Sequence, residues 1–180
     1  GLPSKKTIAG MAPLIEHVHA TVTRIAQAYL GADAEFDRYI AFRLRSRLDL
    51  AEYPAGYYHH DRCGHRLKAY LFLTHVNETT HPLRIALGSH RTLYFKYDDL
   101  YSSRFTNSFV EANYQVVSMT GAQGEGFIFD TNAIHKADGA GQLGQGQRDV
   151  ICFEFNLHNK SARMRELVAD LPCGQEGQRV

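Results

Sequence analysis

Two side chains that could bind a metal ion, His59 and Asp61, are two residues apart in the sequence. On an extended strand they point to one face, whereas His60 points to the other. A second imidazole from a distant strand, for which His135 is the candidate, would complete a set of two histidines and one carboxylate. This set leaves coordination positions open on a non-haem Fe(II), which indicates chemistry rather than a structural clamp.

The elements that must position these residues are short strands. From residue 37 to residue 157, short apolar runs alternate with turns rich in Gly, Asn, Asp and Pro, which is typical of a sandwich, jelly roll or barrel. The predicted strands span residues 39–48, 57–61, 67–76, 83–87, 115–119, 126–130 and 149–157. Before them, apolar residues recur every three or four positions over residues 11–30, which predicts a helix that ends at Gly31.

The expected organisation is a single domain of 180 residues. Residues 1–35 would form an N-terminal helical flank, residues 36–158 the β core, and residues 159–180 a C-terminal helix and tail. Within the core, residues 88–113 form a long insertion with the character of a lid or of an ordinary surface loop. Its aromatic residues Tyr94, Phe95 and Tyr97 could close over a substrate or pack beneath the loop.

The composition narrows the classes of function. The chain is 44% hydrophobic and carries 20 basic and 19 acidic residues, so it can bury a core and has no strong field that would attract nucleic acid or lipid. Three widely separated cysteines do not form a disulfide framework and suit a reducing compartment. No apolar run approaches the roughly 20 residues of a membrane span. We therefore expect a cytoplasmic protein that acts on a small molecule.

A longer pattern surrounds the two potential ligands. Its parts, in order, are His59-x-Asp61-x-x-Gly64, an apolar strand that opens with Leu67-Lys68, Gly88-Ser89-His90, the distal His135, and Arg148. In this order and over roughly residues 36–157, the chain resembles the phytanoyl-CoA dioxygenase-like branch of the Fe(II)/2-oxoglutarate-dependent oxygenases. The combined pattern is much more specific than any single part of it.

The resemblance implies a mainly β fold with flanking helices, namely a double-stranded β-helix (a cupin-like jelly roll). It implies that His59, Asp61 and His135 bind iron and that Arg148 binds the remote carboxylate of the cosubstrate 2-oxoglutarate. These roles agree with the chemistry of the residues, because imidazole and carboxylate suit Fe(II) and the planar guanidinium fork matches a carboxylate. Lys68 is a further candidate for cosubstrate binding.

Candidate substrate contacts are three arginines that alternate along the predicted strand 39–48, namely Arg43, Arg45 and Arg47. In the family this strand tends to line the pocket, so these arginines could bind an anionic substrate or assist 2-oxoglutarate. A solvated outer face is the alternative. Asn132 could orient a ligand or could serve the turn that precedes His135.

The function expected from the resemblance is oxidation of a small molecule by O2, with conversion of 2-oxoglutarate to succinate and CO2. Hydroxylation is favoured because Asp61 is present, whereas halogenating relatives have a small residue at this position. Two alternatives stay open. One is a cupin-type metalloenzyme that does not use 2-oxoglutarate, and the other is a catalytically silent β-helix that binds a ligand.

Overall fold

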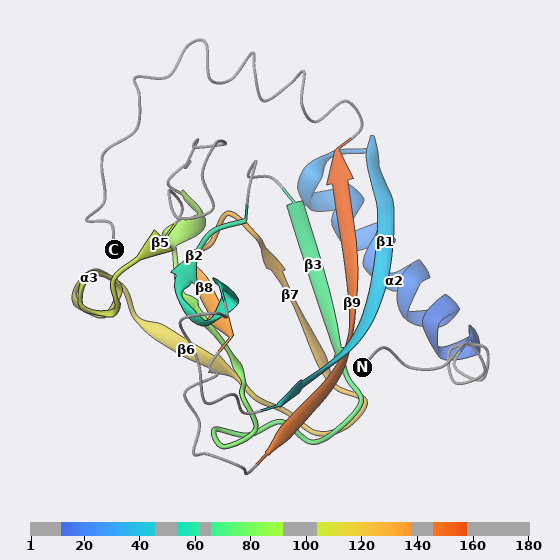
Figure 1. The fold of residues 1–180 in the computed structure, drawn as a ribbon. Helices are drawn as coiled ribbons and strands as arrows, with labels where there is room; N and C mark the ends of the chain where they lie inside the picture. Colours follow the sequence, from blue (N-terminus) through green and yellow to red (C-terminus); the bar gives the residue numbers. More distant parts are fainter. Residues whose placement is uncertain (1–11, 46–53, 62–65, 92–103, 138–145, 158–180) are drawn as a thin grey trace, which may run out of the picture.

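Two antiparallel sheets dominate the computed structural model, which describes residues 12–45, 54–61, 66–91, 104–137 and 146–157 (Figure 1). The four-stranded sheet has the order β1 (Ala34–Arg45), β9 (Gln147–Leu157), β3 (Arg66–Phe72) and β7 (Gly126–Asp130). The five-stranded sheet has the order β5 (Arg104–Phe105), β2 (Tyr58–His59), β8 (His135–Ala137), β4 (Leu83–Ala86) and β6 (Val116–Met119). Strands distant in the sequence are thus neighbours in both sheets, as expected of a jelly roll.

The helix α2 (Ala12–Leu30) covers the outer face of the four-stranded sheet (Figure 1). Its apolar positions recur at helical spacing, and Val22 and Ala26 are buried in the core beneath it. The helix ends at Gly31, which has a φ of 119° and donates its backbone N–H to the Gln27 carbonyl at 3.0 Å. None of the described helices is long and apolar enough to cross a membrane.

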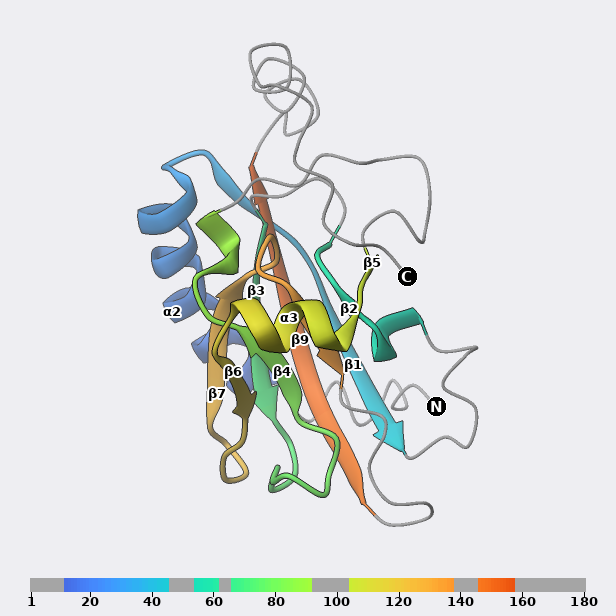
Figure 2. The same ribbon diagram turned by 90° about the vertical axis from the view of Figure 1, so that its left-hand side faces the viewer.

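The shorter helix α3 (Asn107–Asn113) packs on the five-stranded sheet (Figure 2). Thr106 caps it, because its hydroxyl oxygen accepts a hydrogen bond from the Phe109 backbone N–H at 3.2 Å. Val110 is completely buried against Tyr58 and Phe105 of the adjacent strands. The outer face of this sheet is therefore apolar beneath α3, and its polar side chains lie on the inner face.

Aromatic side chains fill much of the space between the two sheets. Tyr70 of β3 and Phe127 of β7 are stacked with ring centroids 5.2 Å apart. Phe72 and Val150 belong to the same apolar cluster and are almost completely buried. Since successive residues of a strand face opposite ways, β9 is buried on both faces, toward α2 and toward this interior.

The structure departs from the strand prediction at short elements. Neither β5 nor β8 was expected, and β1 begins at Ala34, five residues before the predicted start at residue 39. Two 3-10 turns also occur, η1 (Pro54–Gly56) and η2 (Ser89–Arg91). The predicted C-terminal helix and the central part of the predicted lid, with Tyr94, Phe95 and Tyr97, lie outside the described residues.

Candidate metal centre

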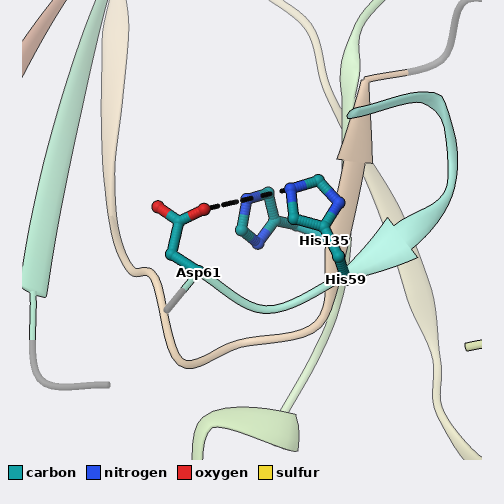
Figure 3. Close-up of side chains that lie close together, drawn as sticks. All are labelled: His59, Asp61 and His135. Carbon is teal, nitrogen blue, oxygen red and sulfur yellow. Dashed lines mark ion pairs between the residues drawn. The ribbon is translucent and has the colours of Figure 1, made fainter. Parts of the chain in front are cut away.

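The side chains of His59, Asp61 and His135 point toward one another (Figure 3). His59 on β2 and His135 on β8 are direct partners in the five-stranded sheet, and Asp61 follows two residues after His59. Asp61 Oδ1 lies 3.9 Å from His59 Nε2 and 3.8 Å from His135 Nε2. Elsewhere in the described part of the chain, no other three His, Cys, Asp or Glu residues come together in this way.

Backbone carbonyl groups set the orientation of both imidazole rings. His59 Nδ1 lies 2.7 Å from the Tyr57 carbonyl oxygen, and His135 Nδ1 lies 2.8 Å from the Ala133 carbonyl oxygen. In the neutral tautomer that donates from Nδ1, each Nε2 keeps a lone pair. Both lone pairs therefore belong to the nitrogen atoms that lie closest to Asp61, which is the arrangement found in metal-binding histidines.

Burial keeps the histidines neutral. Burial, together with the neighbouring His135, lowers the pKa of His59 to about 3, and burial lowers the pKa of His60 to about 4. Burial likewise lowers the pKa of His135. Burial alone would raise the pKa of the Asp61 carboxyl group. The neighbouring His135 and Lys68 lower this pKa by more, so the net pKa lies below the usual value. At neutral pH the site thus offers two neutral imidazoles and one carboxylate.

Lys68 holds the second oxygen of the Asp61 carboxylate. Lys68 Nζ lies 2.6 Å from Asp61 Oδ2 and 3.4 Å from Glu154 Oε1. Glu154 is 3% exposed and also contacts Arg38 Nε at 2.9 Å and Arg66 at 3.8 Å. Burial alone would lower the pKa of Lys68, but the Asp61 carboxylate raises it above the usual value. Lys68 is therefore placed as a support for Asp61.

Ser89 fixes the chain that leads into His135. Its side chain is completely buried, donates to the Ala86 carbonyl at 2.7 Å and accepts a hydrogen bond from the Ile134 backbone N–H at 2.8 Å. The Ile134 carbonyl in turn accepts from the Ala86 N–H at 2.9 Å. In the sequence, the only signal for this role of Ser89 is its place in the Gly88-Ser89-His90 motif.

Asn132 serves the turn that precedes β8. Its backbone N–H donates to Asp130 Oδ1 at 2.8 Å, and its side-chain amide donates to the His90 carbonyl at 2.9 Å. These bonds join the end of β7 to η2, next to the Ser89 contacts. Two roles were considered for Asn132, and these hydrogen bonds correspond to its role in the turn.

The arginines of β1 lie apart from the triad. Arg43 and Arg45 are exposed and lie on the same side of the strand as Ala41, which packs in the core beneath α2. The Arg43 guanidinium makes two contacts of 2.6 Å with the Asp149 carboxylate on the neighbouring strand. Arg43 and Arg45 thus lie on a solvated outer face, which was one of the two placements considered for them. Arg47 lies outside the described residues.

Arg148 lies on the inner side of β9. Its side chain is 1% exposed and falls on the same face of the strand as Val150 and Glu154. Because Val150 belongs to the cluster between the sheets and Glu154 contacts Lys68, Arg148 presents a buried cation to the interior of the roll.

Phe129 contacts His135 and also lines a second feature, an apolar pocket of about 450 Å³. The ring centroids of Phe129 and His135 are 5.0 Å apart in an edge-to-face arrangement. Ile25 and Tyr29 of α2 and Leu87 after β4 line the same pocket. No residue of the metal triad lines this pocket.

The residues present fit a metal ion. The triad supplies two imidazole nitrogens and one carboxylate oxygen within 4.8 Å of one another, each oriented by a further contact. Three protein ligands of this kind on one side of a metal suit Fe(II) with open positions. A structural zinc site usually has four protein ligands, which this group does not provide.

Solved structures share this fold. SnoN, an epimerase solved with Fe3+, alpha ketoglutarate and nogalamycin RO, has a TM-score of 0.60 and 14% identity, covering 99% of this chain and 74% of SnoN. EctD from S. alaskensis, solved with 2-oxoglutarate and 5-hydroxyectoine, has a TM-score of 0.54 and 20% identity over 74% of this chain. AviO1 from Streptomyces viridochromogenes has a TM-score of 0.50 and 19% identity over 75% of this chain.

This chain covers 48% of EctD and 56% of AviO1, so it spans about half the length of these neighbours. No protein-family model and no curated protein matches the chain. At these identities the comparisons establish the fold class. The chain is a jelly-roll protein of mainly β structure, and its fold is shared with proteins solved with iron and with 2-oxoglutarate.

Proposed function

We propose that this chain is the catalytic domain of an Fe(II)/2-oxoglutarate-dependent oxygenase that hydroxylates a small molecule. The observation that carries the proposal is the convergence of His59, Asp61 and His135, with both Nε2 atoms near one carboxylate oxygen. The shared fold of SnoN and EctD, which were solved with iron and the 2-oxoacid, supports the same class. Membership of the phytanoyl-CoA dioxygenase-like family is part of the proposal and rests on the motif order in the sequence.

In the proposed reaction, one oxygen atom of O2 enters the substrate as a hydroxyl group and the other enters succinate, with release of CO2. Iron(II) together with 2-oxoglutarate supplies the oxidising power that protein side chains lack. His59, Asp61 and His135 hold the metal through one atom each. Lys68 fixes the orientation of Asp61, and the Phe129 ring, which packs edge to face against His135, limits the access of water to that imidazole.

Arg148 is the proposed anchor for the remote carboxylate of 2-oxoglutarate. Its guanidinium group stays charged, is buried and lies on the inner side of β9. The planar guanidinium fork matches a carboxylate through two parallel hydrogen bonds. Lys68, the other cosubstrate candidate, is instead engaged with Asp61 and Glu154.

The test is an anaerobic titration of the metal-free protein with Fe(II) and then with 2-oxoglutarate, followed by visible absorption. A chelated 2-oxoacid gives a weak charge-transfer band, which we expect in the wild type. His135→Ala should abolish the band, and Arg148→Met should shift its half-saturation to at least tenfold higher 2-oxoglutarate. Arg24→Met, at an exposed position of α2, is the control and should leave the titration unchanged.

The two alternatives give different results in this titration. Iron binding without a band would contradict use of 2-oxoglutarate and would favour the cupin-type metalloenzyme. Absence of stoichiometric metal binding would contradict every metal-dependent function and would favour a silent β-helix.

A further inference from the structure

The apolar pocket beside Phe129 has a volume of about 450 Å³ and is lined by residues of both sheets and of α2. Two strands that contribute to it, β7 and β6, are the edge strands of the four-stranded and the five-stranded sheet. The pocket therefore lies on a side of the roll where both sheets end. Its volume falls within the range of roughly 300–1,000 Å³ that is typical of small-molecule sites.

Exposed apolar side chains gather at this pocket. Five large apolar side chains are exposed in the described part of the chain, and three of them, Ile25, Tyr29 and Leu87, line the pocket with exposed fractions of 44%, 52% and 48%. Ile85 and Phe129 line the same pocket and are buried. Single exposed apolar residues are common, but a group of them around a hollow is typical of a binding site.

Asp130 supplies a carboxylate to the lining of the pocket. Its Oδ1 atom accepts a hydrogen bond from the Asn132 backbone N–H at 2.8 Å, and its Oδ2 atom accepts one from the Tyr29 hydroxyl at 2.9 Å. A carboxylate has about four acceptor positions, so these two bonds leave acceptor capacity on both oxygens. Both donors are neutral groups, and neither compensates the negative charge of Asp130.

The other polar and aromatic residues of the pocket favour a cation over an anion. The described residues that line it include no lysine or arginine, and His90 is the single basic side chain among them. Tyr29 and Phe129 add two aromatic rings, whose faces attract positively charged groups. A carboxylate, two aromatic rings and aliphatic walls together match a ligand with an apolar body and a positive charge.

We propose that this pocket binds a small apolar molecule that carries one positively charged amino group. The ammonium group donates hydrogen bonds to the Asp130 carboxylate, and the apolar body packs against Ile25, Leu87 and the aromatic rings. No member of the metal triad lines the pocket, so this site is separate from the metal centre. The inference goes beyond the proposed function and does not depend on it.

Three probes of nearly equal shape test the inference. In 2-naphthylmethylamine the side group is positively charged, in 2-naphthylmethanol it is neutral, and in 2-naphthoate it is negatively charged. Each probe is titrated at pH 7 into the full chain, free of metal and in the presence of a chelator, and binding is measured by calorimetry. We expect the amine to bind roughly tenfold more tightly than the alcohol, because it forms a charged hydrogen bond with Asp130. The naphthoate should bind more weakly than the alcohol.

Variants assign the binding to this pocket. Ile25→Gln and Leu87→Gln change exposed side chains, so the fold should persist, and each should weaken binding of the amine roughly fivefold through lost apolar contact. Leu14→Gln is the matched control, because Leu14 is 43% exposed on the same helix and does not line the pocket. Asp130→Asn should bring the affinities of the amine and the alcohol close together. The comparison of the three probes in the wild type decides the question even if Asp130→Asn does not fold.

Several results would overturn the inference. Equal affinities for the amine and the alcohol in the wild type would show that positive charge is not recognised. No binding of any probe to the full chain would show that the pocket does not take a small molecule, as expected if another segment or a second copy of the chain fills it. Wild-type affinity in both Ile25→Gln and Leu87→Gln would place the binding elsewhere. Because the titration contains no metal, its result is independent of whether the chain binds Fe(II) and 2-oxoglutarate.

Discussion

Lys68 Nζ lies 2.6 Å from Asp61 Oδ2, whereas the other oxygen of that carboxylate, Oδ1, lies nearest to the two imidazole Nε2 atoms. The ammonium group and the two imidazoles therefore engage different oxygens of one carboxylate. This division leaves Oδ1 for a metal and holds Oδ2 away from it. Asp61 is thus arranged to bind a metal through a single oxygen, which keeps more positions open for other ligands.

Replacement of Lys68 by methionine should weaken metal binding roughly 10- to 100-fold, the range typical when a partner of a metal ligand is removed. Loss of the nearby positive charge by itself favours binding of a metal cation. The carboxylate of Asp61 also loses its fixed orientation, which weakens metal binding, and we expect this second effect to dominate. Competition of Mn(II) with a chelating dye measures the affinity. Arg38→Met, which removes an exposed contact of Glu154, is the control, and equal affinities for wild type and Lys68→Met would contradict the role.

Glu154 should matter for stability rather than for metal binding directly. It is 3% exposed and contacts Lys68, Arg38 and Arg66, so Glu154→Gln weakens three contacts at once. We expect the free energy of unfolding to fall by about 1–3 kcal/mol, since charged hydrogen bonds of a buried group are lost. Urea unfolding of the metal-free protein measures this, with Glu111→Gln on the exposed side of α3 as the control. A change below about 0.5 kcal/mol would contradict the prediction.

Ser89→Ala should affect both stability and the metal site. The change leaves the buried Ile134 N–H without its hydroxyl partner, which costs about 1–3 kcal/mol. The same N–H precedes His135, so we also expect weaker Mn(II) binding. The two readouts are urea unfolding and the dye competition, and Ser108→Ala at an exposed position of α3 is the control. A stability loss with unchanged metal affinity would show that Ser89 supports the fold but not the ligand.

Much of the fold could be predicted from the sequence because its longer elements carry a clear period. The alternation along β3 and β9 and the helical spacing of α2 depend on local burial and are visible in the residues themselves. The strands β5 and β8 have two and three residues, which is too short for any period. Their existence depends on pairing with β2, a relation between distant segments.

The candidate ligands could be predicted from local features of the sequence, because residue type and spacing suggested His59 and Asp61 and the motif order suggested His135. The residues that contact these ligands could not be predicted in this way. Lys68 stands opposite Glu154 only because β3 and β9 are neighbours, and Arg104 stands opposite His59 only because β5 and β2 are neighbours. Alternation along a strand defines two faces, but it does not state which of them faces the interior.

The metal-free protein should lose stability as the pH falls from about 6.5 toward 4. The pKa values of His59 and His60 are about 3 and 4 in the folded protein, and that of His135 is also lowered, whereas unfolded histidine titrates near 6.5. Over this range the unfolded chain binds protons that the folded chain does not, so each histidine lowers the free energy of unfolding by up to about 1.4 kcal/mol per pH unit.

His60→Gln isolates one of these contributions without removing a proposed metal ligand. Urea unfolding at pH 7, 6 and 5 in the presence of a chelator should give a shallower loss of stability than in the wild type. His75→Gln, at an exposed position, is the control. A wild-type stability that stays constant from pH 7 to pH 5 would contradict the burial of neutral histidines. Because the folded imidazoles stay unprotonated in this range, saturating Mn(II) should raise the free energy of unfolding by a similar amount at each pH and leave the slope unchanged.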